Sequence, residues 1–446
     1  MAILLLLPLV FCVIALYRST PERALVTVCL PVLLIIPVYL QLKLPLLPPI
    51  DAGEAVFLPL GIAMLFGRMR LWKFSRTDLW MVVLIISACS ADYMKGDTTI
   101  GIFNLFVQVT TALFPYMAGK LLIEQRGQRV VVAKRIVGCV FLICVPAMFE
   151  FVAKKNLFLN ALGRLDPSVW GIWRTQVRWG FGRVAGPYGQ SELAGMILLV
   201  AILMTFWLGY WNHWSPRFAR FPALPWKQSR VILLVLLATS ITTQARGPWL
   251  GLGLGFAIAV VGLAKRVVLT SIVVAVVLAI GGTFFYTAGS NYLNAPTVTL
   301  EQQTAQYRQD LLKNYQGVAE RGGAWGWGRE FPRIDGQMSI DNQYLLTWLT
   351  RGYIGVAMLL LLMADTLFTL GRNCFGTSRR EDRHFAFCLL GIFAGLMLTL
   401  GTVYLGEQSY EVFFLLVGWS QALGKAPVAV AKRRAAPQRD QLQAYT

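Results

Sequence analysis

Long apolar runs alternate with short polar connections along most of the chain. Runs such as Val267–Ile280 are almost entirely apolar and lack the alternation of a strand with one wet face. They are about 16 to 22 residues long, the length that a helix needs to cross about 30 Å of hydrocarbon. Because the strands of an outer-membrane barrel alternate apolar and polar residues, the pattern excludes that class. It predicts an all-α polytopic integral membrane protein.

The runs place about 12–13 transmembrane helices, since two runs are short and the pair around Arg246 also fits one broken helix. The predicted spans are 1–17, 25–41, 54–67, 79–91, 103–123, 136–152, 191–210, 231–244, 248–264, 267–288, 342–370, 385–405 and 409–424.

Composition agrees with a membrane protein. Of the 446 residues, 56% are hydrophobic and 14% are charged, against roughly a quarter charged in soluble domains. A soluble enzyme and a disordered chain are therefore excluded. The seven cysteines include no CxxC pair, so neither a disulfide framework nor a zinc site is expected.

Charge predicts the orientation of the helices. The 41 Lys and Arg residues outnumber 22 Asp and Glu residues and give a formal net charge of +19. The excess lies in alternate connections and in the basic tail 425–446, which the positive-inside rule assigns to the cytoplasm. The charge thus reports topology, and no nucleic-acid partner is expected. The intervening short connections carry acids, namely Asp51, Glu54, Asp92, Asp97 and Glu407.

Two long loops, 153–190 and 289–340, fall on the predicted outer, periplasmic face. The first is strongly basic, which opposes the orientation signal. Either it binds an anionic ligand, or it crosses regardless of charge, as long loops do. In the second loop, residues 299–320 have helical spacing and predict an amphipathic helix lying over the bundle.

Three polar motifs lie where chemistry would be placed in a membrane protein, because intramembrane polar residues are costly. The first runs through a glycine-rich turn into a span, the second interrupts an apolar stretch, and the third enters the span 342–370. Their candidate residues are Arg178, Arg183, Gln190 and Glu192; Arg246, Gly247 and Trp249; and Arg329, Asp341, Asn342 and Tyr344.

Each motif also has a structural explanation. Gly247, Gly251 and Gly255 form a small-residue ridge of the kind that packs helices closely. Asp341 and Asn342 are both good helix N-caps. The intramembrane Glu150 and Asp365 have no partner that the sequence identifies.

The three motifs, in this order and with a long outer loop before the third, resemble the O-antigen ligase/polymerase superfamily of bacterial envelope glycosyltransferases. The family has an Arg before a glycine-rich turn, similar to Arg183 before GPYGQSELAG, and an Arg-Gly-x-Trp-Leu motif, matched at 246–250. Its signature of G-x-G, Phe-Pro, His-Asn and Glu-x-Gly is similar to Gly326-Trp-Gly328, Phe331-Pro332, Asp341-Asn342 and Arg351-Gly352. The resemblance covers mainly residues 183–360. Asp341 stands where the ligases have a histidine, which favours a polymerase.

The resemblance implies an O-antigen-ligase-like, GT-C-type bundle over residues 1–424 in the bacterial inner membrane. It implies metal-independent, inverting transfer of a glycan from undecaprenyl pyrophosphate to an acceptor hydroxyl at the outer face, with no cofactor. The acceptor is another lipid-linked repeat in a polymerase of exopolysaccharide or O-antigen, or lipid A-core or a protein in a ligase. Other polysaccharide assembly proteins are possible partners.

The candidate residues suit that chemistry. Arg183 and Arg246 would compensate the charge that a leaving pyrophosphate gains, and Asp341 would be the general base. The remaining candidates would bind substrate. A lipid-linked oligosaccharide transporter and a non-catalytic scaffold stay as rivals, although the sequence has no internal repeat of the transporter kind.

Overall fold

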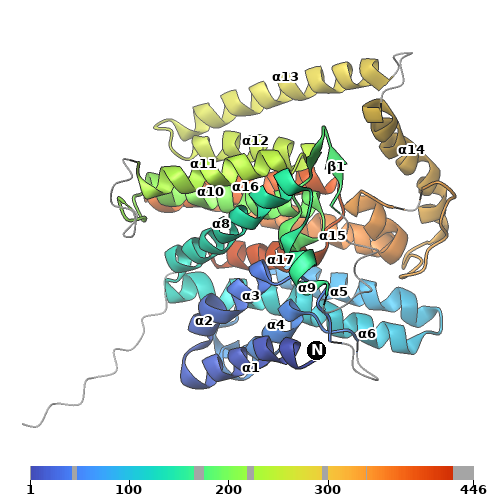
Figure 1. The fold of residues 1–446 in the computed structure, drawn as a ribbon, viewed down its shortest axis with the longest axis horizontal. Helices are drawn as coiled ribbons and strands as arrows, with labels where there is room; N and C mark the ends of the chain where they lie inside the picture. The colour runs from blue at the N-terminus through green and yellow to red at the C-terminus, as the bar shows by residue number, and fades with distance from the viewer. Residues whose placement is uncertain are drawn as a thin grey trace, which may run out of the picture.

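The computed structural model is a bundle of helices (Figure 1). It describes residues 2–42, 48–164, 175–217, 226–293, 300–337 and 339–424, and the predicted tail 425–446 lies outside them. In the described part, every predicted span contains helical structure, although the helices within 25–41 and 385–405 end earlier, at Ile35 and Leu400. Seven helices are long and apolar enough to cross a membrane, and four apolar helices are shorter. The prediction of an all-α polytopic membrane protein is therefore confirmed, and the larger number of spans stays a prediction.

The elements follow one another with few strands. The first helices are α1 (Ala2–Arg18), α2 (Pro21–Ala24), α3 (Leu30–Ile35), α4 (Ala52–Gly67), α5 (Arg76–Met94), α6 (Thr98–Gln108), α7 (Phe114–Ala118), α8 (Arg129–Ala153) and α9 (Leu157–Leu162). Strands β1 (Val177–Arg178) and β2 (Phe181–Gly182) form an antiparallel hairpin. There follow α10 (Ser191–Tyr210), α11 (Gln228–Thr242), α12 (Arg246–Val261), α13 (Val267–Leu293), α14 (Leu300–Arg321), α15 (Gln343–Gly376), α16 (Arg380–Leu400) and α17 (Glu407–Ala422). π-helical turns continue α6 and α7 into one helix, so that 98–126 forms a single candidate span.

The helix termini gather at two ends of the bundle. One, here called the loop end, carries the hairpin, α9 and α14, on the right of Figure 1. The other, the basic end, carries the arginine-rich connections. Ion pairs join its connections, among them Arg68 with Glu22 and Arg129 with Asp382.

Helices α12 and α16 touch through their glycines. A Cβ on Gly251 or Gly395 would collide with the carbonyl oxygen of the other residue, and Gly255 and Gly391 face each other in the same way. The predicted small-residue ridge is therefore a packing surface. It brings the first residues of α12 against the last turn of α16.

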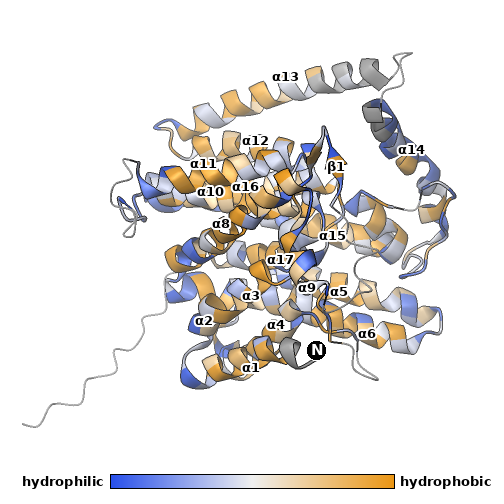
Figure 2. Ribbon diagram, in the orientation of Figure 1, coloured by the Kyte–Doolittle hydropathy of each residue, from blue (hydrophilic) through white to orange (hydrophobic). Residues whose placement is uncertain are grey.

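Helix α13 lies at the edge of the bundle, and α14 descends from its far end (Figure 1). Only 6% of the apolar stretch Val267–Phe284 of α13 is buried. Figure 2 shows that α13 is apolar and that α14, which follows it, is hydrophilic. The predicted amphipathic helix over 299–320 is confirmed as α14. Its Leu311 and Tyr315 pack with Ile340, Leu345 and Leu349 around the start of α15.

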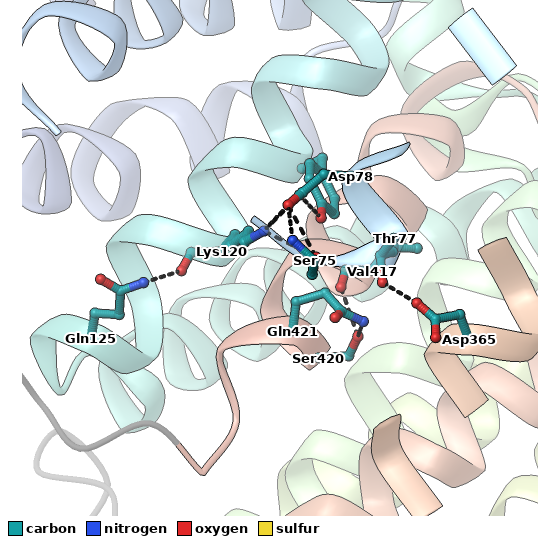
Figure 3. Close-up of polar contacts among 10 residues, drawn as sticks. Ser75, Thr77, Asp78, Lys120, Gln125, Asp365, Val417, Ser420 and Gln421 are labelled. Atoms are coloured by element: carbon teal, nitrogen blue, oxygen red, sulfur yellow. Dashed lines mark hydrogen bonds and ion pairs between the residues drawn. The ribbon is translucent and has the colours of Figure 1, made fainter. Parts of the chain in front are cut away.

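A buried polar cluster fastens the basic end (Figure 3). Lys120 is fully buried and donates to both carboxylate oxygens of Asp78, at 2.6 Å each. Asp365 accepts a hydrogen bond from Thr77 and forms an ion pair with Arg76 at 3.2 Å. Both intramembrane acids of this cluster thus have partners, which favours a structural role for it.

Candidate functional site at the loop end

Glu150 anchors the loop that leads into α10. The side chain lies near the end of α8 and is 1% exposed. Its Oε2 accepts from the N–H groups of Ala185 at 3.1 Å and Gly186 at 2.8 Å. Its Oε1 accepts from Asn156 and Thr175. Four donors therefore satisfy a carboxylate whose partners the sequence does not identify, and they hold the first motif in place.

Arg183 is the buried cation of this motif. It is 6% exposed, and its Nη2 forms an ion pair with Oε1 of Glu192 at 2.6 Å. Its Nη1 donates to the side chain of Gln176, and its Nε donates to the carbonyl of Thr243 at 3.4 Å. Three elements therefore fix the guanidinium: the hairpin region, the start of α10 and, 60 residues away, the turn before α12.

The first and second motifs meet on that turn. Nη1 of Arg178 donates to the carbonyl of Gln244 at 3.0 Å, next to the Thr243 carbonyl that Arg183 reaches. Gln244 has a φ of 51°, which lets α11 stop and α12 begin at Arg246. We call Arg178, Arg183 and Arg246 around residues 242–245 the arginine turn. Arg246 is exposed there, and Nε1 of Trp249 donates to Ser240, which fastens the turn.

The third motif reaches the same region through the last turn of α16. The carbonyl of Gly247 accepts from Thr399 at 3.4 Å, and Nδ2 of Asn342 donates to the carbonyl of Gly401 at 3.1 Å. Tyr344 donates from its hydroxyl to Met397 at 2.8 Å. The end of α16 thus contacts both the start of α12 and the start of α15.

Asn342 and Asp341 have different roles. Asn342 is the N-cap of α15, because its side chain accepts from the N–H of Leu345. Asp341 does not cap the helix; its Oδ1 accepts from the hydroxyl of Ser339 at 2.6 Å, and the residue is partly exposed. Its carboxylate is therefore accessible.

A cavity of about 220 Å³, here called the arginine cavity, opens beside Arg183. Gly189, Gln190 and Ser191 bring the start of α10 to it, and Tyr404 and Glu407 close another side. Burial raises the pKa of Tyr404, and the carboxylates of Glu407, Asp341 and Glu192 add to that rise. Tyr404 therefore lies near acids of the first and third motifs, although no motif marked it in the sequence.

A second cavity of about 350 Å³, here called the acidic cavity, adjoins the first, and Glu407 lines both. Asp51, Glu54 and Glu411 also line it, together with Arg329. Glu411 is 3% exposed, and its Oε2 has no hydrogen-bond partner among the described residues. Burial raises the pKa of Asp51 to about 6.

The sequence did not predict this acidic cluster. It placed Asp51 and Glu54 in one outer connection and Glu407 in another, and their shared side was the one available signal. In the part of the chain that the structure describes, no group of three or more His, Cys, Asp or Glu residues is arranged to hold a metal ion.

Helix α15 is broken at Gly352, whose φ of 64° and ψ of −163° are not helical. The loop after α14 inserts there. The N–H groups of Trp327 and Gly328 donate to the carbonyls of Leu349 and Thr350, and the N–H groups of Tyr353 and Ile354 donate to Gly323 and Ala324. The loop 323–328 thus pairs backbone to backbone with α15 on both sides of the break.

Arg329 is positioned by the same loop. Its N–H donates to Oδ1 of Asp92 at 2.8 Å, which ties the loop to the end of α5. Arg351, beside the break, donates to the hydroxyl of Tyr410 at 3.4 Å.

No protein-family model matches the chain, and no curated protein matches its sequence.

Proposed function

We propose that the protein transfers a glycan from undecaprenyl pyrophosphate to an acceptor hydroxyl at the outer face of the bacterial inner membrane. A polymerase of exopolysaccharide or O-antigen repeats is preferred, and an O-antigen ligase is the alternative. The observation that carries the proposal is the arginine turn. Two arginines of one loop bond neighbouring carbonyls of a turn that itself ends in a third arginine. Such a concentration of guanidinium groups suits a pyrophosphate.

The reaction needs positive charge where the leaving group departs. As the bond between the anomeric carbon and the pyrophosphate oxygen breaks, that oxygen keeps the electron pair and gains negative charge. Arg183 and Arg246 would stabilise this charge, because guanidinium stays protonated and binds phosphate with two parallel hydrogen bonds. Start-of-helix N–H groups of α10, at Ser191 beside the arginine cavity, favour an anion at the same place.

The reaction also needs a base for the acceptor. Asp341 would take the proton of the acceptor hydroxyl while the hydroxyl oxygen forms the new bond to the anomeric carbon. Attack opposite the leaving group inverts that carbon. The partly exposed carboxylate of Asp341, held by Ser339 near Tyr404, suits this role. Glu407 is the carboxylate to compare with Asp341, because Glu407 lines both the arginine cavity and the acidic cavity.

A complementation experiment tests the proposal. A deletion strain receives wild type, Arg183→Ala, Arg246→Ala, Asp341→Asn or Glu407→Gln, and membrane levels of each variant are verified. Asp335→Asn is the matched control for Asp341, because Asp335 is an exposed acid of the same loop. The readouts are polymer length and the amount of lipid-linked repeat.

We expect the Arg246 and Asp341 variants to make little polymer and to accumulate lipid-linked repeat, by about 10²-fold or more for each. Normal polymer from all of the arginine and Asp341 variants would refute the site. Loss of polymer with Glu407→Gln but not with Asp341→Asn would identify Glu407 as the general base in place of Asp341. Loss of lipid A-core capping in the deletion strain would identify a ligase, and repeat trapped on the cytoplasmic face would identify a transporter.

A further inference from the structure

A third cavity, of about 610 Å³, lies at the basic end where α13 leaves the bundle. We call it the basic cavity. Its cations are Lys265, Arg266 and Arg383, and no acid is among the residues that line it. The acids nearest in sequence to Arg383 have other partners: Asp382 pairs with Arg129, and Glu381 contacts His213 at 2.7 Å. The positive charge of the cavity is therefore not compensated by its own lining.

The basic cavity also offers hydrogen-bond donors to an anion. Nε of Arg383 is buried and has no hydrogen-bond partner among the described residues. Val267, Val268 and Leu269, the first residues of α13, also line the cavity. The first N–H groups of a helix have no acceptor within the helix, and the helix dipole makes that end positive. Phosphate binds at such helix starts.

The remaining lining is apolar, and most of it is exposed. Leu269 is 53% exposed, Ile272 is 56% exposed and Phe375 is 56% exposed. Leu269 and Ile272 follow the charged group along α13, and Phe375 comes from the end of α15. A ligand that fits has an anionic head and apolar chains.

We infer that the basic cavity binds the phosphate headgroup of an anionic phospholipid, from the leaflet at the basic end. Basic pockets between helices on the cytoplasmic side are typical sites for such headgroups. The bound lipid would fill the space between the start of α13, the end of α15 and the start of α16. Phe375 reaches the cavity from α15, and Arg383 reaches it from α16. It would brace a helix that is otherwise scarcely buried and that carries α14 to the start of α15. This inference does not depend on the proposed glycosyl transfer.

Native mass spectrometry and thermal unfolding of the purified full-length protein test it. The probes are cardiolipin, phosphatidylglycerol, phosphatidylcholine and inorganic phosphate. The variants are Arg383→Gln and the exposed pair Lys265→Gln/Arg266→Gln, which is less prone to disturb folding. Arg230→Gln is the control, since it removes an exposed cation at the same end outside the cavity.

We expect cardiolipin and phosphatidylglycerol to bind and to raise the unfolding temperature of wild type and of Arg230→Gln. Each cation removed from the cavity should weaken that binding about fivefold. Phosphatidylcholine should have no such effect. Equal lipid binding by both cavity variants and wild type would overturn the inference. Complete displacement of cardiolipin by millimolar inorganic phosphate would also overturn it, in favour of a free-anion site.

Discussion

Arg183 and Glu192 form an ion pair in which Nη2 lies 2.6 Å from Oε1. The side chain of Arg183 is 7% exposed and that of Glu192 is 21% exposed, so water screens the pair only on the Glu192 side. Glu192 lies in the first turn of α10, and the pair therefore ties the basic loop to the start of a core helix. An anionic ligand at this place would compete with Glu192 for the guanidinium of Arg183.

Removing one partner of this ion pair should destabilise the protein more than the pair's removal as a whole would suggest. Arg183→Ala and Glu192→Ala each leave a charge without its partner, and such losses cost up to about 3–5 kcal/mol for fully buried pairs. The double variant leaves neither charge, so we expect it to lower the unfolding temperature by less than the sum of the single variants. Thermal unfolding in detergent measures this. Arg217→Ala, an exposed arginine elsewhere, is the control, and simple additivity would contradict the coupling.

Gly352 should not tolerate a side chain. Its positive φ disfavours any other residue, and a Cβ there would collide with the backbone of Ala324 and Gly326. We expect Gly352→Ala to separate the inserted loop from α15 and to speed hydrogen exchange at Trp327 and Gly328. Gly371→Ala on the same helix is the control, because nothing lies within 4 Å of its added Cβ. Equal exchange in both variants would show that the insertion is not needed.

Much of the fold follows from hydropathy alone. Apolar length is a local property, and each predicted span contains helical structure for that reason. The break between α11 and α12 and the amphipathic α14 were also readable, because Gln244-Ala-Arg-Gly-Pro interrupts an apolar run and 299–320 has helical spacing.

The site was less accessible to sequence reasoning. Arg183 and Thr243 are 60 positions apart in the chain, and only the folded bundle brings the hairpin onto the turn. The break at Gly352 had no local signal either, since a glycine within an apolar run is common in membrane helices. Its partners are backbone groups of 323–328, which no side-chain pattern encodes. The acidic cavity assembles from three connections for the same reason.

The glycine contact between α12 and α16 should be sensitive to a single methyl group. Gly251→Ala places a Cβ against the carbonyl of Gly395 and 2.6 Å from Oγ1 of Thr399. We expect a loss of about 1–3 kcal/mol, because the helices must move apart. Gly253→Ala is the control on the same helix, since nothing lies within 4 Å of its Cβ. Thermal unfolding compares the two, and similar losses would argue against a specific ridge.

Asp51 should make stability depend on pH. Burial raises its pKa from 3.8 to about 6, so the folded protein holds the proton more tightly than the unfolded chain does. Its contribution to stability is therefore complete below about pH 4 and is lost as the pH rises through about 6. We expect the unfolding temperature of wild type to fall over this range, and the fall to be smaller in Asp51→Asn.

Asparagine is the informative replacement because it removes the titration and keeps the cap. Asp51 is the N-cap of α4, where its side chain accepts from the N–H of Glu54 at 2.8 Å, and Asn caps helices equally well. Glu54, Glu407 and Glu411 face the same cavity and interact electrostatically with Asp51, so the difference between the two pH curves reports Asp51 together with its effect on these acids. The exposed Asp335→Asn variant should reproduce the wild-type curve. Parallel curves for wild type and Asp51→Asn would mean that the Asp51 carboxyl is ionised in water and that the acidic cavity is open to it.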